Sequence, residues 1–210
     1  MTRIKICGIT NLNDALAAVK FGANALGFVF YKKSPRYISP KKAKKIIQSL
    51  PVFISSVGVF VNEKEKQVKR IAQFCGLSYL QFHGSETAKY CGRFNGYKII
   101  KAFRIKDIHS FKNIRNFKKV KAYLFDAFDK KSFGGTGKAF NWDLLKPYLK
   151  LKKPIILSGG LNIRNIQEAI KKFSPYALDL SSGVEISCGK KNPKLLKQIF
   201  RQIYKKPTYQ

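Results

Sequence analysis

The sequence predicts an α/β fold of one domain, a closed (β/α)8 barrel, from three observations. Eight short apolar runs rich in β-branched and aromatic residues recur along the 210 residues, and most intervals between them carry helical periodicity. No Pro/Ser-rich linker or low-complexity tract divides the chain. Strands that alternate with helices pair in parallel through right-handed crossovers. At roughly 26 residues per unit, eight units lie near the lower size limit of a TIM barrel.

The predicted strands follow one another without interruption along the chain. They are Ile4–Cys7, Ala25–Phe30, Phe53–Val61, Tyr79–Phe82, Lys98–Phe103, Ala122–Phe125, Pro154–Leu157 and Ala177–Leu180. An open doubly wound sheet is the alternative, but no G-x-G-x-x-G motif follows the first strand. The expected barrel therefore spans residues 1–210, with 205–210 as a short polar tail.

Helices are predicted where apolar residues recur at i, i+3, i+4 and i+7. Such sets are Ala43, Ile46, Ile47 and Leu50 after Ser39-Pro40; Val68, Ile71, Ala72 and Cys75 between Asn62 and Gly76; Ile163, Ile166 and Ile170 after Asn162; and Leu195, Leu196, Ile199, Phe200 and Ile203 after Asn192-Pro193. The cap residues Ser39 and Gly76 and the first-turn Pro40 fit helix ends. The sixth unit is the weakest, because only Trp142–Leu149 can supply its helix.

The charge of the chain is extreme, with 42 Lys and Arg against 11 Asp and Glu and a formal net charge of +31. Such a balance attracts polyanions and steers small anionic substrates. The lysines are spread over the whole length, whereas dedicated nucleic-acid binders usually confine them to one arm or face. We therefore expect a solvated basic surface that binds nucleic acid non-specifically, if at all.

The four cysteines, Cys7, Cys75, Cys91 and Cys188, form no CxxC pair and have no metal-ligand spacing. The first residues enter a strand with no apolar signal stretch, and no run has the length of a transmembrane helix. A cytoplasmic protein without a membrane partner is the simplest expectation. Its oligomeric state, monomer or homodimer, stays open.

Polar residues gather where the predicted strands end, and the active sites of such barrels lie at that edge. The candidates are Cys7, Arg36, Gln81, His83, Asp126, Ser158, Gly159, Gly160, Asp179, Ser181, Ser182 and Gly183. Gly159-Gly160 after strand seven is either a tight turn or a site where backbone N–H groups approach a ligand. With Ser181, Ser182 and Gly183 in the next loop, at the start of a short additional helix, the pair predicts a phosphate site.

The other candidates have two interpretations each. Cys7 is a buried thiol or a general base, and a base requires nearby cations or helix termini to favour the thiolate over a thiol of pKa about 8.5. Asp126 is a structural carboxylate or a general acid. Arg36 binds a substrate carboxylate or is one more surface cation. His83 is a core histidine or a site residue, and His109 is expected at the surface.

The ordered motifs together resemble the phosphoribosylanthranilate isomerase family over nearly the whole chain. They are Lys5–Thr10, Gly27–Phe30, Ser34–Tyr37, Gly58–Asn62, Leu80–Gly84, Gly134–Gly137, Leu157–Leu161 and Asp179–Glu185. The sequence departs from the family after Glu185, where Cys188-Gly189 and Asn192 replace the usual proline-glycine pair and aspartate. Asn192 still caps a helix well, so little effect on the chemistry is expected.

The resemblance implies an Amadori rearrangement of N-(5′-phosphoribosyl)anthranilate in tryptophan biosynthesis, without metal or organic cofactor. It implies that Cys7 is the general base, that Asp126 is the general acid and that Arg36 receives the anthranilate carboxylate. The glycines and serines after strands seven and eight match the phosphate site, and Gly134–Gly137 matches a mobile loop.

Three rival functions fit the sequence less well. An indole-glycerol-phosphate synthase would need catalytic lysines and glutamates that the strand ends do not supply. A metal-dependent epimerase would need paired His and Asp ligands, and the chain has only His83 and His109. A nucleic-acid-binding barrel would need exposed aromatics interleaved with cations, but most aromatics fall at predicted core positions.

Overall fold

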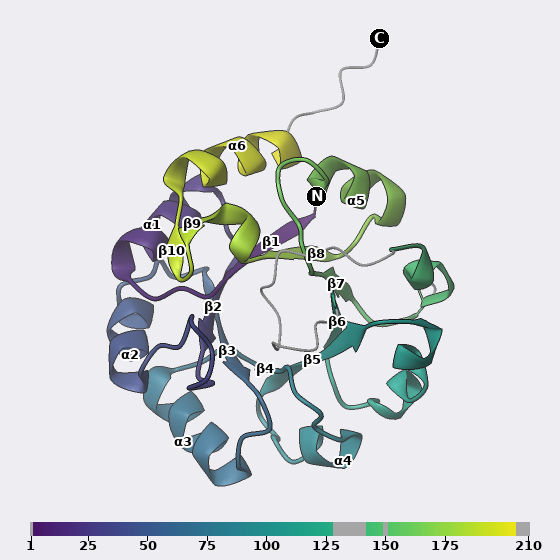
Figure 1. The fold of residues 1–210 in the computed structure, drawn as a ribbon. Coiled ribbons are helices and arrows are strands. Elements are labelled where there is room, and N and C mark those ends of the chain that lie inside the picture. Colours follow the sequence, from purple (N-terminus) through teal and green to yellow (C-terminus); the bar gives the residue numbers. More distant parts are fainter. Residues whose placement is uncertain (1, 128–141, 149–150, 205–210) are drawn as a thin grey trace.

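The computed structural model describes residues 2–127, 142–148 and 151–204. In this part of the chain, eight parallel strands close into a barrel in the order of the sequence, with helices as the outer ring (Figure 1). The predicted fold class is confirmed. The predicted tail 205–210 and the Gly134–Gly137 motif lie outside the described residues.

All eight predicted strands are present, and their ends differ from the predicted ones by two residues at most. The strands are β1 Arg3–Cys7, β2 Ala25–Val29, β3 Ser55–Phe60, β4 Tyr79–Phe82, β5 Lys98–Ile105, β6 Ala122–Ala127, β7 Ile155–Leu157 and β8 Ala177–Leu180. The barrel closes where β1 pairs with β8, in a register that places Lys5 opposite Asp179. Residues far apart in sequence thereby become neighbours at the closure.

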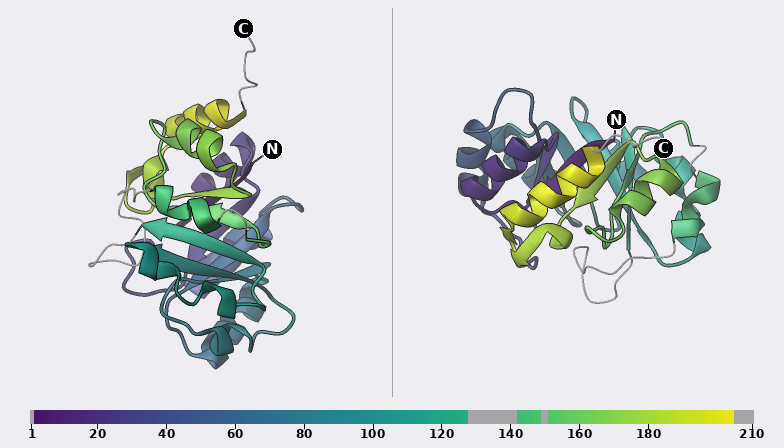
Figure 2. Two further views of the ribbon diagram at one scale, coloured as in Figure 1. Left: turned by 90° about the vertical axis from the view of Figure 1, so that its right-hand side faces the viewer. Right: turned by 90° about the horizontal axis from the view of Figure 1, so that it is seen from above.

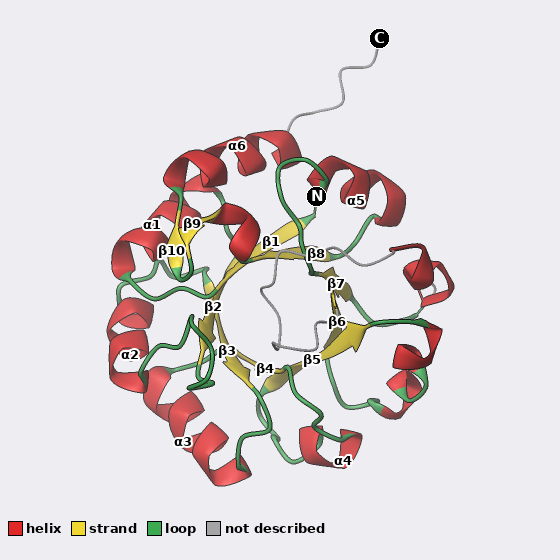
Figure 3. Ribbon diagram, viewed as in Figure 1, coloured by secondary structure: helices red, strands yellow, loops and turns green. Residues whose placement is uncertain are grey.

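The helices lie outside the barrel, as the red elements around the yellow strands show (Figure 3). They are α1 Leu12–Phe21, α2 Pro40–Gln48, α3 Glu65–Cys75, α4 Ala88–Cys91, α5 Ile166–Phe173 and α6 Pro193–Tyr204. Ser39 caps α2 through the backbone N–H of Lys42, and Gly76 ends α3 at φ 67°. α1 and α4 were not predicted, whereas α3, predicted between Asn62 and Gly76, begins after Lys64 and ends at Cys75.

Short 3-10 helices lie on both sides of β6 and after β8. Those near β6 are η1 Ile108–Phe111, η2 Ile114–Asn116 and η3 Trp142–Tyr148, and η4 Ser182–Val184 follows β8. The sixth unit, predicted as a helix over Trp142–Leu149, contains a 3-10 helix with Pro147 inside it. Proline has no N–H to donate and disfavours a regular α-helix at this point.

Strand alternation explains how the barrel separates its core from its site. Successive side chains point to opposite faces of a strand, so Ala122, Leu124 and Asp126 of β6 share one face. Ala122 and Leu124 belong to a compact apolar cluster with Val57, Ile100, Ala102, Ile156 and Ala177. A larger apolar cluster lies between strands and helices. Asp126 therefore continues an interior row at the carboxyl end of its strand.

A small antiparallel hairpin, β9 Glu185–Ser187 and β10 Lys190–Lys191, connects η4 to α6. The sequence analysis predicted only a helix cap here, and the cap is present, since the Asn192 side chain accepts the backbone N–H of Lys194 at 2.9 Å. The side views show α6 beside α1 and α5, where it completes the outer ring (Figure 2). Among the described helices, none is long and apolar enough to cross a membrane.

Candidate active site

A polar pocket opens at the carboxyl ends of the strands. Of the predicted site residues, seven line it: Cys7, Arg36, His83, Asp126, Ser158, Asp179 and Ser181. Val29, Tyr31, Ser34, Val59 and Val61 complete the lining. The lining thus combines apolar and aromatic side chains from β2, β3 and the residues after them with ionisable and hydroxyl groups, which suits a ligand with an aromatic ring and anionic ends.

The floor on the β1 side is a buried ion pair beside the thiol. Lys5 and Cys7 are two residues apart on β1 and share the interior face. The Lys5 ammonium binds both carboxylate oxygens of Asp179, at 2.8 and 2.9 Å. Gly27 of β2 leaves room for them, since a Cβ there would lie 2.7 Å from Cys7 Sγ and 3.1 Å from Lys5 Nζ. The sequence analysis missed Lys5, although a lysine two positions before Cys7 in an apolar strand was a usable signal.

The ionisation of Cys7 reflects opposing effects. Burial raises the pKa of the Cys7 thiol above its ordinary value, Asp179 acts in the same direction, and the charges of Lys5 and Lys191 act against both. The cations expected from the sequence are therefore present, but burial has the larger effect on the Cys7 pKa. Burial would lower the pKa of Lys5, but the Asp179 carboxylate and the Cys7 side chain hold it above its ordinary value, so Lys5 is a permanent cation.

A chain of three buried side chains from β4 and β6 forms the opposite side. Asp126 Oδ2 lies 3.0 Å from His83 Nε2, and Asp126 Oδ1 accepts the backbone N–H of Ala127 at 3.0 Å. Gln81 Nε2 donates to His83 Nδ1 at 2.9 Å, so the ring nitrogen that faces Asp126 carries the proton. Gln81 was predicted to bind substrate, but it does not line the pocket. It lies behind His83 and orients the imidazole.

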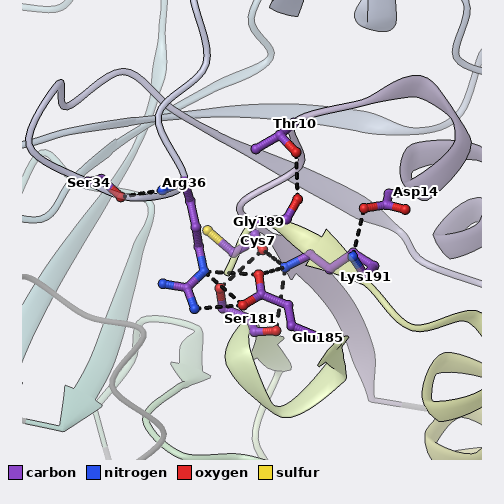
Figure 4. Close-up of polar contacts among 9 residues, drawn as sticks. All are labelled: Cys7, Thr10, Asp14, Ser34, Arg36, Ser181, Glu185, Gly189 and Lys191. Carbon is purple, nitrogen blue, oxygen red and sulfur yellow. Dashed lines mark hydrogen bonds and ion pairs between the residues drawn. The ribbon is translucent and has the colours of Figure 1, made fainter. Parts of the chain in front are cut away.

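Arg36 is a buried residue, not a surface cation. Figure 4 shows its guanidinium directed toward the Glu185 carboxylate. Its stem packs against Gly8, where φ is 77° and a Cβ would lie 2.5 Å from Arg36 Cδ. Glu185 of the hairpin accepts from Arg36 Nε at 2.9 Å and from Nη2 at 2.6 Å. Burial would raise the pKa of the Glu185 carboxyl, but the hydrogen bonds from Arg36 and the charge of Lys191 hold it below its ordinary value. The sequence analysis did not identify Glu185 or Lys191 as site residues.

The loops after β7 and β8 pack against each other at the pocket edge. Gly159 and Gly160 have φ values of 87° and 67°, a conformation that favours glycine. A Cβ on Gly183 would clash with the backbone carbonyl oxygen of Leu161, so glycine is required for the contact between the loops. The predicted short helix after β8 is present as η4, directly after Ser181. Gly159, Gly160, Ser182 and Gly183 do not line the described pocket, but they directly follow its lining residues Ser158 and Ser181 along the chain.

Other predicted features are also located. His109 is exposed and Cys75 is buried in the core, as expected. Within residues 2–127, 142–148 and 151–204, no three His, Cys, Asp or Glu side chains gather into a metal site.

Comparison with known proteins identifies the family to which this arrangement belongs. The family model described as N-(5′-phosphoribosyl)anthranilate (PRA) isomerase matches residues 4–202. N-(5′-phosphoribosyl)anthranilate isomerase of Citrifermentans bemidjiense is 47% identical over 205 residues, 98% of each chain. The crystal structure of phosphoribosyl anthranilate isomerase from Thermotoga maritima superposes with a TM-score of 0.90 at 40% identity, covering 96% of this chain and 98% of that one. A structure of phosphoribosyl anthranilate isomerase in complex with reduced 1-(o-carboxyphenylamino)-1-deoxyribulose 5-phosphate superposes with a TM-score of 0.87, also at 40% identity and with the same coverage. The chain therefore belongs to the PRA isomerase family.

Proposed function

We propose that this isomerase converts N-(5′-phosphoribosyl)anthranilate into 1-(2-carboxyphenylamino)-1-deoxyribulose 5-phosphate, an Amadori rearrangement of tryptophan biosynthesis, with Asp126 as general acid and Cys7 as general base. The observation that carries the proposal is the presence of Cys7 and Asp126 on different strands of one pocket, with Arg36 and the β7 and β8 loops around them. The family and the ligand of the related structure agree with this substrate class.

The substrate has two anionic ends, and the pocket offers a place for each. The phosphate fits the Gly159-Gly160 pair and the Ser181–Gly183 turn beside the pocket, because glycine has no side chain that would keep a ligand away from its backbone N–H group. The anthranilate carboxylate fits Arg36, because a guanidinium has five N–H donors and can serve Glu185 and a ligand together. Binding at two ends fixes the ribose between Cys7 and Asp126.

The reaction then needs two proton transfers at adjacent positions of the sugar. Asp126 gives its proton to the furanose ring oxygen as the C1′–O bond breaks, and the anilino nitrogen lone pair forms an iminium ion. The Cys7 thiolate removes the proton from C2′, which gives an enolamine that tautomerises to the ketone. Neither step changes the oxidation state of a protein group. Each transfer requires its carrier within hydrogen-bond reach of the sugar.

Neighbouring side chains prepare these two groups. Lys5 places a fixed positive charge beside the thiol, which favours the thiolate against burial. Gln81 and His83 hold the Asp126 carboxyl in one orientation at the pocket floor. Both carboxylate oxygens of Asp179 bind the Lys5 ammonium, so the positive charge of Lys5 is held at one place beside Cys7.

The test is turnover of freshly generated phosphoribosylanthranilate, followed by loss of anthranilate-type fluorescence. The wild-type protein is compared with Cys7→Ala and Asp126→Asn, with Cys91→Ala as a matched control, because Cys91 is a buried cysteine away from the pocket. We expect both site variants to lower kcat far more than they weaken phosphate binding, and the control to retain turnover. Normal turnover in Cys7→Ala would remove the base assignment, and absence of turnover in a folded wild-type protein would remove the substrate.

A further inference from the structure

Lys191 is a fully buried lysine that the proposed chemistry does not use. It lies on β10, and its ammonium donates to Cys7 O at 2.5 Å, to Glu185 Oε1 at 2.6 Å and to Ser181 O at 3.4 Å (Figure 4). Its backbone N–H donates to Asp14 Oδ2 at 2.7 Å, which fixes the strand to α1. Lys191 therefore contacts the carboxyl ends of both β1 and β8 while it stays outside the pocket lining.

The ammonium of Lys191 has the surroundings of a charged group. It has three N–H donors, and an acceptor lies at each of them. Burial lowers the pKa of Lys191 from its ordinary value, while the Glu185 carboxylate and the Cys7 side chain oppose that change. The Lys191 ammonium lies 2.6 Å from a Glu185 carboxylate oxygen, and Arg36 binds the same carboxylate, so the geometry is that of a buried ion pair.

The charge around Lys191 differs from that around the other buried lysines. In the described part of the chain the buried lysines are Lys5, Lys101 and Lys191. Lys5 is paired with Asp179 and Lys101 with Glu86, so each of those pairs is neutral. Lys191 instead shares the single carboxylate of Glu185 with Arg36, and the three groups together carry one net positive charge.

The net charge of Arg36, Glu185 and Lys191 determines how strongly this group attracts the substrate carboxylate. An Arg36–Glu185 pair alone would be neutral, and a neutral pair attracts an incoming anion weakly. Glu185 holds the Arg36 guanidinium in place through Nε and Nη2. Because Lys191 balances the negative charge of Glu185, the positive charge of Arg36 still acts on a ligand in the pocket. Arg36 lines the pocket, whereas Glu185 and Lys191 lie behind it.

We infer that Lys191 is a positioning residue that balances Glu185, so that Arg36 is held rigidly and still presents net positive charge to the carboxylate of an aromatic acid. The inference rests on the proposed function in that Arg36 is taken to receive the anthranilate carboxylate. It adds the reason why a buried arginine that is already paired can bind a second carboxylate.

The experiment measures binding of two probes that each test one end of the pocket. Anthranilate reports the carboxylate end and inorganic phosphate reports the phosphate end, both by calorimetric titration. In Lys191→Met we expect the Kd for anthranilate to rise about tenfold, while the Kd for phosphate stays unchanged. A tenfold change is about what the loss of one positive charge behind Arg36 should cause. The matched control is Lys190→Met, because Lys190 is the exposed neighbour on the same strand. It should leave both constants unchanged.

A second comparison covers a Lys191→Met variant that does not fold. Glu185→Gln is compared with Glu185→Gln/Lys191→Met, in which no buried carboxylate loses its partner. The double variant restores the wild-type net charge, so the anthranilate affinity should fall from the single to the double variant by a similar factor. The inference would be overturned if Lys191→Met weakened the binding of anthranilate and of phosphate equally. It would also be overturned if Glu185→Gln and Glu185→Gln/Lys191→Met bound anthranilate with the same affinity. Turnover by the wild-type enzyme tests the proposed function separately, since neither probe requires catalysis.

Discussion

Replacing Lys5 by methionine tests the buried ion pair at the pocket floor. The substitution keeps a side chain of similar length but removes the ammonium. Among the described residues, Asp179 receives its hydrogen bonds from Lys5 alone, and the side chains of both residues are about 4% exposed. Removal of one partner from a buried pair leaves an uncompensated charge and costs about 3–5 kcal/mol. We expect Lys5→Met to lose about that much free energy of unfolding at neutral pH.

The loss should depend on pH with a definite sign. Burial already raises the pKa of Asp179 above its ordinary value against the opposing charge and hydrogen bonds of Lys5, so loss of the ammonium in the variant should raise it further. Such a carboxyl destabilises the fold while it is ionised, and the penalty shrinks as the pH falls and it takes up a proton. The difference from wild type should therefore narrow between neutral and mildly acidic pH. Lys5→Met/Asp179→Asn, which removes both charges, should recover most of the stability.

The measurement is urea denaturation at several pH values, with Lys66→Met as control, because Lys66 is an exposed lysine on α3. The same variants give the pH profile of kcat/KM, which reports ionisations of the free enzyme. Burial raises the pKa of Cys7, and Lys5 lowers it. The kcat/KM of the wild-type enzyme should therefore increase with pH as Cys7 loses its proton in the alkaline range. In Lys5→Met this increase should occur at a pH higher by about one unit or more. A stability loss no greater than that of Lys66→Met, or an increase at the wild-type pH, would refute the reasoning.

Two further predictions concern the ends of the pocket. Arg36→Ala should raise KM by about tenfold or more, because charge-assisted hydrogen bonds to the substrate are lost, and should change kcat little. Steady-state kinetics test this, with the exposed-residue variant Arg70→Ala as control. An unchanged KM would remove the carboxylate-binding role of Arg36. Gly183→Ala should lower the free energy of unfolding by about 1–3 kcal/mol and weaken phosphate inhibition, because its Cβ would meet Leu161 O and force the β7 and β8 loops apart. Gly92→Ala is the matched control for urea denaturation and inhibition, since its Cβ would lie 3.2 Å from the flexible Lys119 side chain and no nearer than 3.5 Å to a backbone oxygen. Equal effects in the two variants would contradict the loop argument.

The regular part of the fold was predictable because its signals are local. Each strand is a short apolar run, and each long helix has a repeating apolar face, so neighbouring residues alone reveal them. The helices around β6 were harder to predict, since Pro147 and short intervals favour 3-10 turns over regular helices. α1 was missed although Asn11 caps it and Gly22 ends it at φ 112°, signals that were present in the sequence.

The site was predictable in outline for a related reason. In a parallel barrel all strands end at one edge, so strand-end polar residues such as Cys7 and Asp126 converge once the strands are known. The motif series also indicated the family, which the comparisons confirm. The roles of these residues in catalysis stay predictions until the variants are measured.

By itself, the sequence determined the barrel, the order of its strands and the set of residues at its active edge, because these follow from local periodicity and from the geometry of parallel strands. Only the tertiary structure decided how the charges are paired. Lys5 meets Asp179 across the barrel closure, 174 positions away, and Arg36 meets Glu185 across 149. Among 42 basic residues, the apolar strand around Lys5 is a local signal of burial, but no local pattern names the carboxylate that a buried cation meets. That carboxylate becomes a neighbour only when the chain closes on itself.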